Sequence, residues 1–207
     1  MKYIFVAGAP GSKWSSVVKN IYYSPSIDRS DYSDARTYSY TNGNTTEILH
    51  LGAYFDPGME FELPESMSNL SKQQAESIFD QPFSGDGVRI IKSHIFSYKD
   101  NIDYLRELWP DCAMVLVQRA SDICLQWWIK AGHFNISYPS YHKYYKDLTT
   151  VAKLIERQNN GLTDALVNYP SQQVENNQQL AAVLGISQPP TKYSQTYESD
   201  ITVSVIQ

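Results

Sequence analysis

The sequence predicts a single α/β domain, residues 1–207, in which a central parallel sheet of four to five strands is flanked by helices. Its 207 residues are enough for one domain with a substantial core. Hydrophobic residues make up 42% and charged residues 19%, which is typical of a globular protein. Short apolar runs alternate with amphipathic stretches along the chain, and this order indicates parallel strands joined by helices.

The first strand is expected at residues 3–7, a continuous apolar run typical of a strand buried on both faces. A loop at 8–14 follows, and residues 15–22 can form a helix. Residues 24–47 are rich in Ser, Asp, Tyr, Thr and Asn, so we expect a long loop there. The apolar stretch at 48–55 predicts another strand.

The middle of the chain has the clearest pattern. Residues 71–74 (Ser-Lys-Gln-Gln) fit a capping box, which predicts a short helix that ends near Pro82. Two strand-like runs lie at 88–91 and 113–117. Between them, apolar residues at helical spacing over 102–109 predict an amphipathic helix.

The last third of the chain predicts more helices and one more strand. Ser121 is expected to cap a helix, in which Trp127 packs as part of the helix rather than binding a substrate. Further helices are expected at about 141–158 and 172–184. The tail, about 187–207, ends in alternating apolar residues, which predict a strand that closes the sheet edge or pairs with a partner. We count a homodimer among the possible assemblies.

Charge and composition exclude several classes of protein. Lys and Arg number 17 against 22 Asp and Glu, a net charge of −5, so the chain lacks the basic footprint of a binder of nucleic acid or anionic membranes. No apolar run approaches the ~18 residues of a membrane span, and the apolar start is too short for a signal peptide, so we expect a cytoplasmic protein. The two cysteines and four histidines lack the spacing of a disulfide framework or a metal site.

The loop after the first strand has the form of a phosphate-binding loop. Small residues let backbone N–H groups converge on an anion, and the start of the next helix favours negative charge. The loop is not a Walker A motif, because Lys13 and Trp14 stand where a glycine and the phosphate-binding lysine belong. An ordinary tight turn is the alternative. The loop consists of Gly8, Ala9, Pro10, Gly11, Ser12, Lys13, Trp14, Ser15 and Ser16.

The residues that follow the two middle strands indicate the kind of anion. A nucleoside-triphosphate enzyme needs an acidic Mg²⁺ ligand at the end of a neighbouring buried strand. Here the strands end in Lys92-Ser93-His94 and in Gln118-Arg119. Cationic and neutral groups suit an anionic donor substrate that needs no metal, and sulfuryl donors fit that description.

Three segments, 8–15, 89–95 and 105–123, resemble the P-loop sulfotransferases, which take a sulfuryl group from 3′-phosphoadenosine 5′-phosphosulfate (PAPS). They are similar to the family's 5′-phosphosulfate loop, to its strand before the catalytic histidine, and to its helix, strand and Arg-x-x-x-Asp stretch at the 3′-phosphate. Segment 179–186 also resembles the family's late helix. The segments keep the family's order and span most of the chain, as in a divergent small member. The resemblance implies a P-loop NTPase-like fold, PAPS as co-substrate without a metal, and a small-molecule or glycan acceptor.

The resemblance also implies roles for individual residues. The loop residues hold the 5′-phosphosulfate. His94 is the general base that takes the acceptor's proton, and Lys92 and Lys13 stabilise the charge that develops. Arg119 binds the 3′-phosphate, and Gln126 stands where the family places a serine on that phosphate.

Each of these assignments has a simpler alternative. His94 could be an ordinary hydrogen-bonded histidine, and Lys92 a solvated lysine at the sheet edge. Arg119 could form a structural ion pair with Asp122 or another carboxylate. Ser15 or Ser16 could simply cap the next helix.

Two other functions stay open for the whole protein: a P-loop nucleotide kinase or other phosphotransferase, and a non-catalytic nucleotide-binding relative. Dependence on Mg²⁺ distinguishes the first, and acceptor turnover the second. Gly11 in place of the family's usual basic residue, Gln126, and the lack of a C-terminal Arg-Lys-Gly segment keep the second open. The segments expected to shape the acceptor pocket, 24–47, 56–87 and 133–145, carry no recognisable code.

Overall fold

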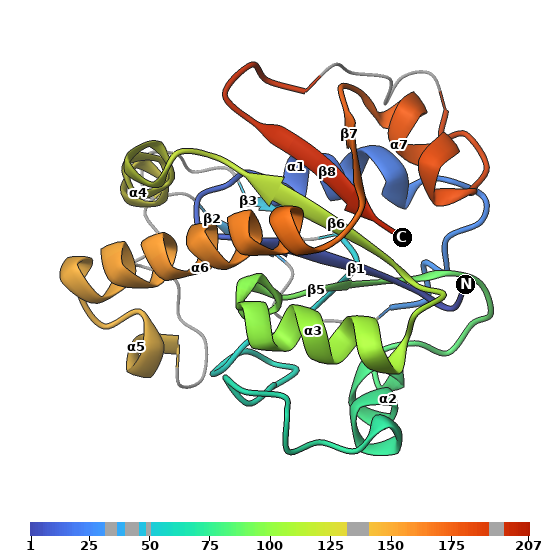
Figure 1. The fold of residues 1–207 in the computed structure, drawn as a ribbon, viewed down its shortest axis with the longest axis horizontal. Helices are drawn as coiled ribbons and strands as arrows, with labels where there is room; N and C mark the ends of the chain where they lie inside the picture. Colours follow the sequence, from blue (N-terminus) through green and yellow to red (C-terminus); the bar gives the residue numbers. More distant parts are fainter. Residues whose placement is uncertain (32–36, 40–45, 49–50, 132–140, 191–196) are drawn as a thin grey trace.

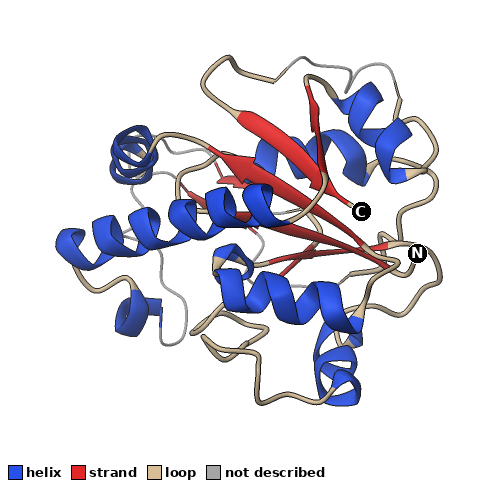
Figure 2. Ribbon diagram, viewed as in Figure 1, coloured by secondary structure: helices blue, strands red, loops and turns tan. Residues whose placement is uncertain are grey.

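The computed structural model describes residues 1–31, 37–39, 46–48, 51–131, 141–190 and 197–207. Over these residues the chain is an α/β protein with a six-stranded mixed sheet flanked by helices (Figures 1 and 2). The predicted α/β class is therefore confirmed. The sheet is larger than the four to five strands expected, and it is not wholly parallel.

The main sheet has the strand order β4-β5-β1-β6-β8-β7. β4, β5, β1 and β6 run parallel, whereas β8 is antiparallel to β6 and β7 is antiparallel to β8. The four parallel strands correspond to the predicted sheet. The strands are β1 (Tyr3–Gly8), β4 (Ala53–Tyr54), β5 (Arg89–Lys92), β6 (Ala113–Gln118), β7 (Ser171–Val174) and β8 (Thr202–Ile206).

The two antiparallel strands account for the difference from the prediction. β7 has the sequence Ser-Gln-Gln-Val with three exposed residues, as is usual for an edge strand, so it carries no apolar pattern. The predicted tail strand exists as β8, but it lies between β6 and β7 rather than at the sheet edge. Both of its hydrogen-bonding edges are occupied within the chain, so this strand has no edge left for a partner.

Helices cover both faces of the sheet (Figure 2). One face is covered by α1 (Trp14–Tyr22) and α7 (Asn177–Leu184), and the other by α2 (Lys72–Asp80), α3 (Lys99–Leu108) and α6 (Leu148–Asn168). The remaining described elements are α4 (Ser121–Lys130), α5 (Tyr141–Tyr144), the 3₁₀ helix η1 (His94–Ser97), and a second antiparallel sheet of β2 (Thr37–Ser39) and β3 (Thr46–Ile48).

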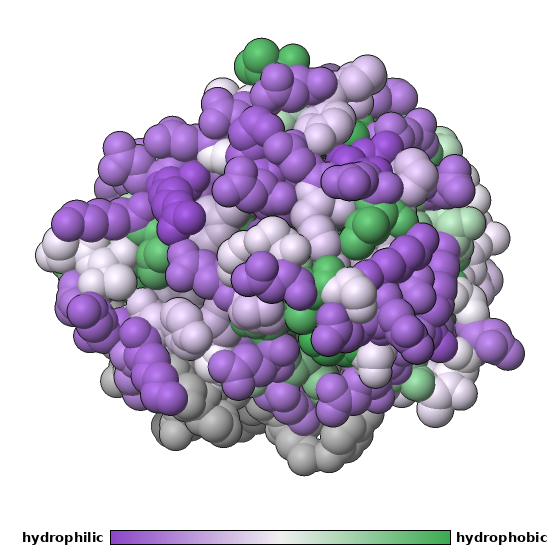
Figure 3. Space-filling model, turned by 60° about the horizontal axis from the view of Figure 1, so that its bottom comes forward, coloured by the Kyte–Doolittle hydropathy of each residue, from purple (hydrophilic) through white to green (hydrophobic). Residues whose placement is uncertain are grey.

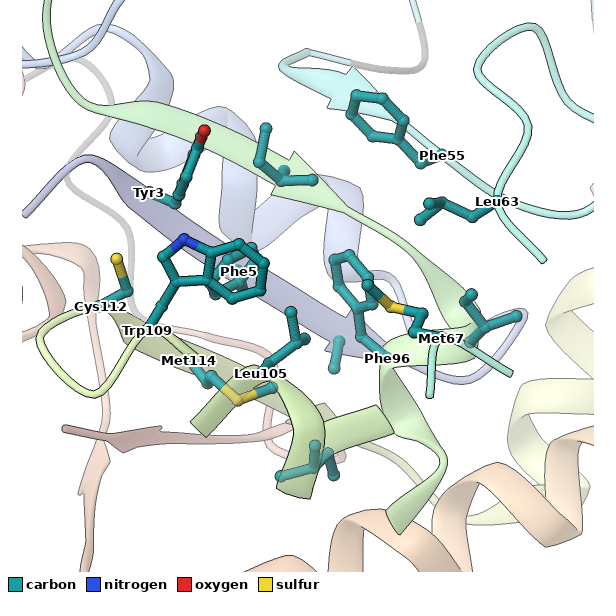
Figure 4. Close-up of a cluster of buried hydrophobic side chains, with 14 of the residues drawn as sticks. Tyr3, Phe5, Phe55, Leu63, Met67, Phe96, Leu105, Trp109, Cys112 and Met114 are labelled. Carbon is teal, nitrogen blue, oxygen red and sulfur yellow. The ribbon is translucent and has the colours of Figure 1, made fainter. Parts of the chain in front are cut away.

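Side chains of β1 alternate between two hydrophobic cores. Tyr3 and Phe5 point into the core under α2, α3 and α6, whereas Ile4 and Val6 point into the core under α1 and α7. In the first core Trp109 lies edge-on to Phe5, with ring centroids 5.7 Å apart (Figure 4). The prediction that this strand is buried on both faces is confirmed, because all six of its residues are buried.

Several helices differ in extent from the prediction. The capping box at 71–74 is confirmed, with both of its hydrogen bonds present. The helix expected at 141–158 is two helices, α5 and α6, and the second continues to Asn168. The segment 172–184 begins as β7, so only its second half is helical. Ser121 is not the cap of α4, because Ala120 holds that position and forms no side-chain cap hydrogen bond.

Two segments in the first third also differ. The stretch 24–47, expected as a long loop, contains β2 and the start of β3. The strand expected at 48–55 is reduced to the two-residue β4, and residues 49–50 lie outside the described part of the chain. The strand is short because Gly52, just before β4, has φ 77°. A residue in this left-handed conformation interrupts the extended backbone of a strand.

The exterior is mainly polar on the face shown in Figure 3, where hydrophobic residues form small separate patches. Among the described residues, no helix combines the length and the apolar character that crossing a bilayer requires. Cys112 and Cys124 are buried free thiols, as expected, and burial raises the pKa of Cys124 to about 11. The two termini lie at the same end of the sheet, opposite the end that carries the predicted site (Figure 1).

Candidate functional site

The strand register gathers the predicted site residues at one end of the sheet. Lys92 pairs with Val6, so two residues further along both strands His94 lies level with Gly8. On the other side of β1 the end of β6 pairs with Gly8, so Arg119 follows beside the loop. The predicted phosphate loop, histidine and arginine therefore meet at the carboxyl ends of parallel strands, where ligands of open α/β sheets usually bind.

The loop at 8–16 has an unusual backbone. Lys13 has φ 62° and ψ 23° and is the N-cap of α1; over the described residues no other non-glycine residue has a positive φ. Such strained conformations cluster at functional sites. Gly11 has φ 82°, and a Cβ there would lie 2.0 Å from the carbonyl oxygen of Cys124 in α4. This close approach and the positive φ explain why glycine occupies the position.

The serines of the loop differ in accessibility. Ser12 is fully buried, and its Oγ has no hydrogen-bond partner among the residues that the structure describes. A buried hydroxyl without a partner is unfavourable, and a bound anion would satisfy it. Ser15 is half-buried and Ser16 is exposed. Neither caps α1, because its N-cap, Lys13, forms no side-chain cap hydrogen bond, so the capping alternative is wrong.

His94 is buried beside the first residue of the loop. Its Nδ1 lies 2.5 Å from the carbonyl oxygen of Gly8. Because a carbonyl only accepts, Nδ1 must carry the proton in this hydrogen bond, and Nε2 of the neutral ring keeps its lone pair. The imidazole stacks on the indole of Trp14, with centroids 4.1 Å apart, and meets the Tyr54 ring edge-on. These contacts fix the position and the tautomer of the ring.

The electrostatic surroundings keep this imidazole neutral. Burial lowers the pKa of His94 below its usual value of 6.5, and the charge of Lys92 acts in the same direction. The charge of Asp56 and the hydrogen bond to Gly8 oppose the shift without reversing it. At neutral pH the ring is therefore in the form that a general base requires.

Asp56 is a site residue that the sequence analysis missed. It lies two residues after the end of β4 and is fully buried. It binds both the backbone of η1 and two tyrosines, so it fixes the position of His94. A carboxylate immediately after the strand predicted at 48–55 was the signal that could have identified it. Its oxygens accept five hydrogen bonds, from Ser93 Oγ (2.8 Å), His94 N (3.1 Å), Ile95 N (3.3 Å), Tyr54 Oη (2.9 Å) and Tyr145 Oη (3.0 Å).

Lys92 ends β5, two residues before His94, and is completely buried. The alternative of a solvated lysine at the sheet edge is therefore wrong. Full burial of a lysine is rare, because a desolvated ammonium is unfavourable unless other groups compensate it. The register places this residue between β1 and β4, at the same end of the sheet as the loop.

Arg119 lies beside the loop but is engaged by a carboxylate of the tail. It donates through Nε (3.0 Å) and Nη2 (2.6 Å) to Oδ2 of Asp200, and through Nη1 to the carbonyl oxygen of Gly11 (3.1 Å). The alternative of a structural ion pair is thus present, with Asp200 rather than Asp122 as the partner. This pairing lowers the pKa of Asp200. A phosphate at Arg119 would have to share the guanidinium with Asp200 or displace this carboxylate.

A second carboxylate of the tail reaches the loop itself. The Lys13 ammonium pairs with Glu198 and lies 4.3 Å from the ring centroid of Trp127. Trp127 is half-buried, and the cationic groups of Lys130 and Arg119 also lie over it. Its neighbour on α4, the predicted phosphate ligand Gln126, is exposed. Trp127 is therefore a residue of α4 that contacts Lys13 of the loop, and sequence reasoning assigned it only to packing.

No protein-family model matches the chain, and neither a curated protein nor a solved structure is significantly similar to it.

Proposed function

We propose that the chain is a sulfotransferase with a P-loop NTPase-like fold, which moves the sulfuryl group of PAPS to a hydroxyl or amine of an acceptor. One observation carries the proposal. His94 is a buried, neutral histidine whose Nδ1 is held by the carbonyl oxygen of Gly8, the first residue of the predicted phosphate loop. A general base and an anion-binding loop are thus joined by one hydrogen bond. The strand, loop and helix order at the centre of the sheet supports the same proposal.

In the proposed reaction the acceptor oxygen attacks the sulfur atom while Nε2 of His94 takes the acceptor's proton. The bond between sulfur and the bridging phosphate oxygen breaks, and its electron pair leaves with adenosine 3′,5′-bisphosphate. The products are the sulfated acceptor and the bisphosphate. His94 then returns the proton to solvent, so the balanced reaction releases one proton.

The cations of the site have separate roles in this proposal. Lys92 and Lys13 supply positive charge for the oxygen on which charge develops as the bond breaks. The backbone N–H groups at the start of α1 and the Ser12 hydroxyl hold the 5′-phosphate. Arg119 holds the 3′-phosphate by exchanging Asp200 for it, because a guanidinium binds either oxyanion through the same fork of donors.

Asp56 bears on the phosphotransferase alternative. A kinase needs a carboxylate with free oxygen lone pairs for Mg²⁺. Asp56 does follow a strand of the sheet, but five donors already occupy its two oxygens. The hydrogen bonds give this carboxylate a positioning role, which favours the sulfotransferase.

The donor substrate is tested by calorimetric titration with adenosine 3′,5′-bisphosphate in the absence of metal, with ATP and Mg²⁺ as the competing pair. We expect micromolar binding of the bisphosphate, equivalent to about −8 kcal/mol. Preference for ATP with Mg²⁺ would assign the chain to the phosphotransferases. Binding of neither would leave the non-catalytic alternative.

The base is tested by the variant His94→Ala with PAPS and a panel of alcohols and amines. Loss of the base should lower turnover by about 10² to 10⁴ and leave bisphosphate affinity nearly unchanged. His142→Ala, an exposed histidine on α5, is the matched control. Unchanged turnover in the His94 variant would exclude the general-base role.

A further inference from the structure

A cavity of about 240 Å³ lies beside η1, between α6 and the segment that follows β4. Its wall is largely apolar or aromatic, and its charged members, Glu65, Lys143 and Lys146, are exposed. No buried charge of the lining therefore matches an ionic group on a ligand. The buried residues of the wall are Pro57, Ile95, Tyr98, Tyr145 and Gln158.

Gln158 supplies a hydrogen-bond acceptor without a partner. The residue lies in the middle of α6, lines the cavity and is only 2% exposed. Its Oε1 makes no hydrogen bond to any residue in the described part of the chain. Leaving a buried carbonyl oxygen unpaired is unfavourable, so a ligand that brings an O–H or N–H donor to it would bind more tightly than one without a donor.

Two contacts connect the cavity to the base. Ile95, in its wall, is the residue after His94. Tyr145, also in the wall, donates its hydroxyl to Asp56 (3.0 Å), whose other oxygen accepts the backbone N–H of His94 (3.1 Å). The cavity therefore shares its supporting residues with the base. The lining also comes from two segments, 56–87 and 133–145, that were expected to shape the acceptor pocket.

We propose that this cavity binds the body of the acceptor, and that the acceptor is a small uncharged molecule with an aromatic or apolar body. It carries a hydroxyl or amine that donates to Gln158, in addition to the group that receives the sulfuryl group at His94. The inference rests on the proposed function, because the acceptor belongs to that reaction. The cavity is smaller than the roughly 300 to 1,000 Å³ of pockets for drug-sized ligands, so it suits a single ring rather than an oligosaccharide.

The test uses two probes of nearly equal shape, benzyl alcohol and ethylbenzene, of which only the first can donate a hydrogen bond. Binding to the full chain is followed by NMR chemical-shift titration. We expect benzyl alcohol to bind about 5- to 10-fold more tightly than ethylbenzene, as one additional hydrogen bond allows. In Gln158→Leu the difference should disappear, whereas Gln173→Leu, an exposed glutamine on β7, should keep it.

The outcomes separate this inference from the proposed function. Equal binding of benzyl alcohol to the wild type and Gln158→Leu, or shifts that avoid η1 and α6, overturns the inference. A chain that binds the bisphosphate but neither probe overturns it too, and leaves the sulfotransferase proposal standing. A chain that binds benzyl alcohol through Gln158 but not the bisphosphate supports the ligand class and overturns the proposed reaction. The melting temperature of each variant shows whether its fold is intact.

Discussion

At His94 the chemistry is decided by which ring nitrogen keeps a lone pair. The carbonyl oxygen of Gly8 fixes Nδ1 as the donor, and stacking on Trp14 holds the plane of the ring. Burial then disfavours the imidazolium. This combination is what the proposed general base requires, because the lone pair that takes the proton then lies on Nε2.

The titration of His94 should follow from its lowered pKa. The folded chain binds its proton less readily than the unfolded chain, whose histidine titrates near pH 6.5. As the pH falls below 6.5 the unfolded state takes up the proton first, so stability decreases with acidification until the folded pKa is passed. NMR of the ring should give a midpoint below 6.5, with Nδ1–H as the neutral tautomer. In His94→Gln this part of the pH dependence of the melting temperature should vanish.

A midpoint above 6.5 would contradict the assignment, because it would mean that the Asp56 charge outweighs burial. An Nε2–H tautomer would also contradict it, since the lone pair needed for proton transfer would then lie on Nδ1, at the Gly8 carbonyl.

Gly11 should be far less tolerant of a side chain than another left-handed glycine. Gly185, with φ 65°, ends α7 and has open space where a Cβ would stand, so Gly185→Ala should lose only about 1 to 2 kcal/mol. Gly11→Ala carries the same backbone penalty and adds a contact of 2.0 Å with the Cys124 carbonyl. We expect a loss of more than about 4 kcal/mol in urea denaturation. Equal losses in the two variants would mean that α4 moves away from the loop easily.

Three parts of the chain form the candidate site: the loop at 8–16, the ends of the parallel strands, and the turn at 198–200 before β8, here called the tail turn. They differ in how far the sequence predicts them. His94 and Arg119 were predictable because each lies within two residues of the end of an apolar strand, and parallel strands align their ends. The sequence predicted Lys92 as a site residue but did not predict that it is buried, because no local sequence pattern marks a lysine as buried. Asp200 reaches Arg119 only through the register of β8 on β6, a pairing between residues about 80 positions apart.

The tail turn bears two carboxylates: Glu198 pairs with Lys13 of the loop, and Asp200 pairs with Arg119 beside the loop. In the proposed function, Lys13 and Arg119 interact with the donor substrate PAPS. A carboxylate paired with a lysine or arginine weakens the attraction of that side chain for a phosphate, because the carboxylate and the phosphate compete for the same N–H donors.

Glu198→Gln should therefore raise the affinity for adenosine 3′,5′-bisphosphate. The pair with Lys13 is partly solvated, since the Glu198 side chain is 54% exposed, so the gain should be modest, about 3- to 10-fold. Calorimetric titration measures it. Glu107→Gln, an exposed glutamate on α3, makes the same change in net charge and should leave the affinity unchanged.

A lower affinity in Glu198→Gln would reverse this interpretation. Glu198 would then orient Lys13 toward the substrate rather than compete with it. An equal rise in the Glu107 variant would trace the effect to net charge, which acts at long range and weakens with salt.

For the whole molecule, β1 is the element on which both cores and the site depend. Its alternate residues enter the two cores, and its last residue, Gly8, begins the loop. The continuous apolar pattern at 3–7 predicted this central place. The antiparallel part of the sheet was less predictable. β7 is polar and has no apolar pattern. The alternating apolar residues of β8 indicate a strand with one buried face, but they do not indicate which strands lie beside it.

The interior position of β8 gives a last prediction. Ending the chain at Asp200 removes three buried apolar residues, Val203, Val205 and Ile206, and leaves β7 without a neighbour. Each such side chain contributes about 1.5 to 3 kcal/mol, so the loss approaches the 5 to 15 kcal/mol that stabilises most domains. We expect the shortened chain to lose its near-ultraviolet circular dichroism and to aggregate. Removing only the exposed Gln207 should preserve both the signal and the monodisperse state.

A cooperative, soluble chain ending at Asp200 would contradict this expectation and would show that β4, β5, β1 and β6 with their helices fold independently. The parallel strands carry the loop, His94 and Arg119, so such a chain could still bind the bisphosphate. It would also lack the anchor of the tail turn, because β8 is what holds Glu198 and Asp200 beside the loop. Comparing its bisphosphate affinity with that of full-length Glu198→Gln would then distinguish two effects on binding. One is the negative charge of the tail turn, and the other is the position in which β8 holds that turn.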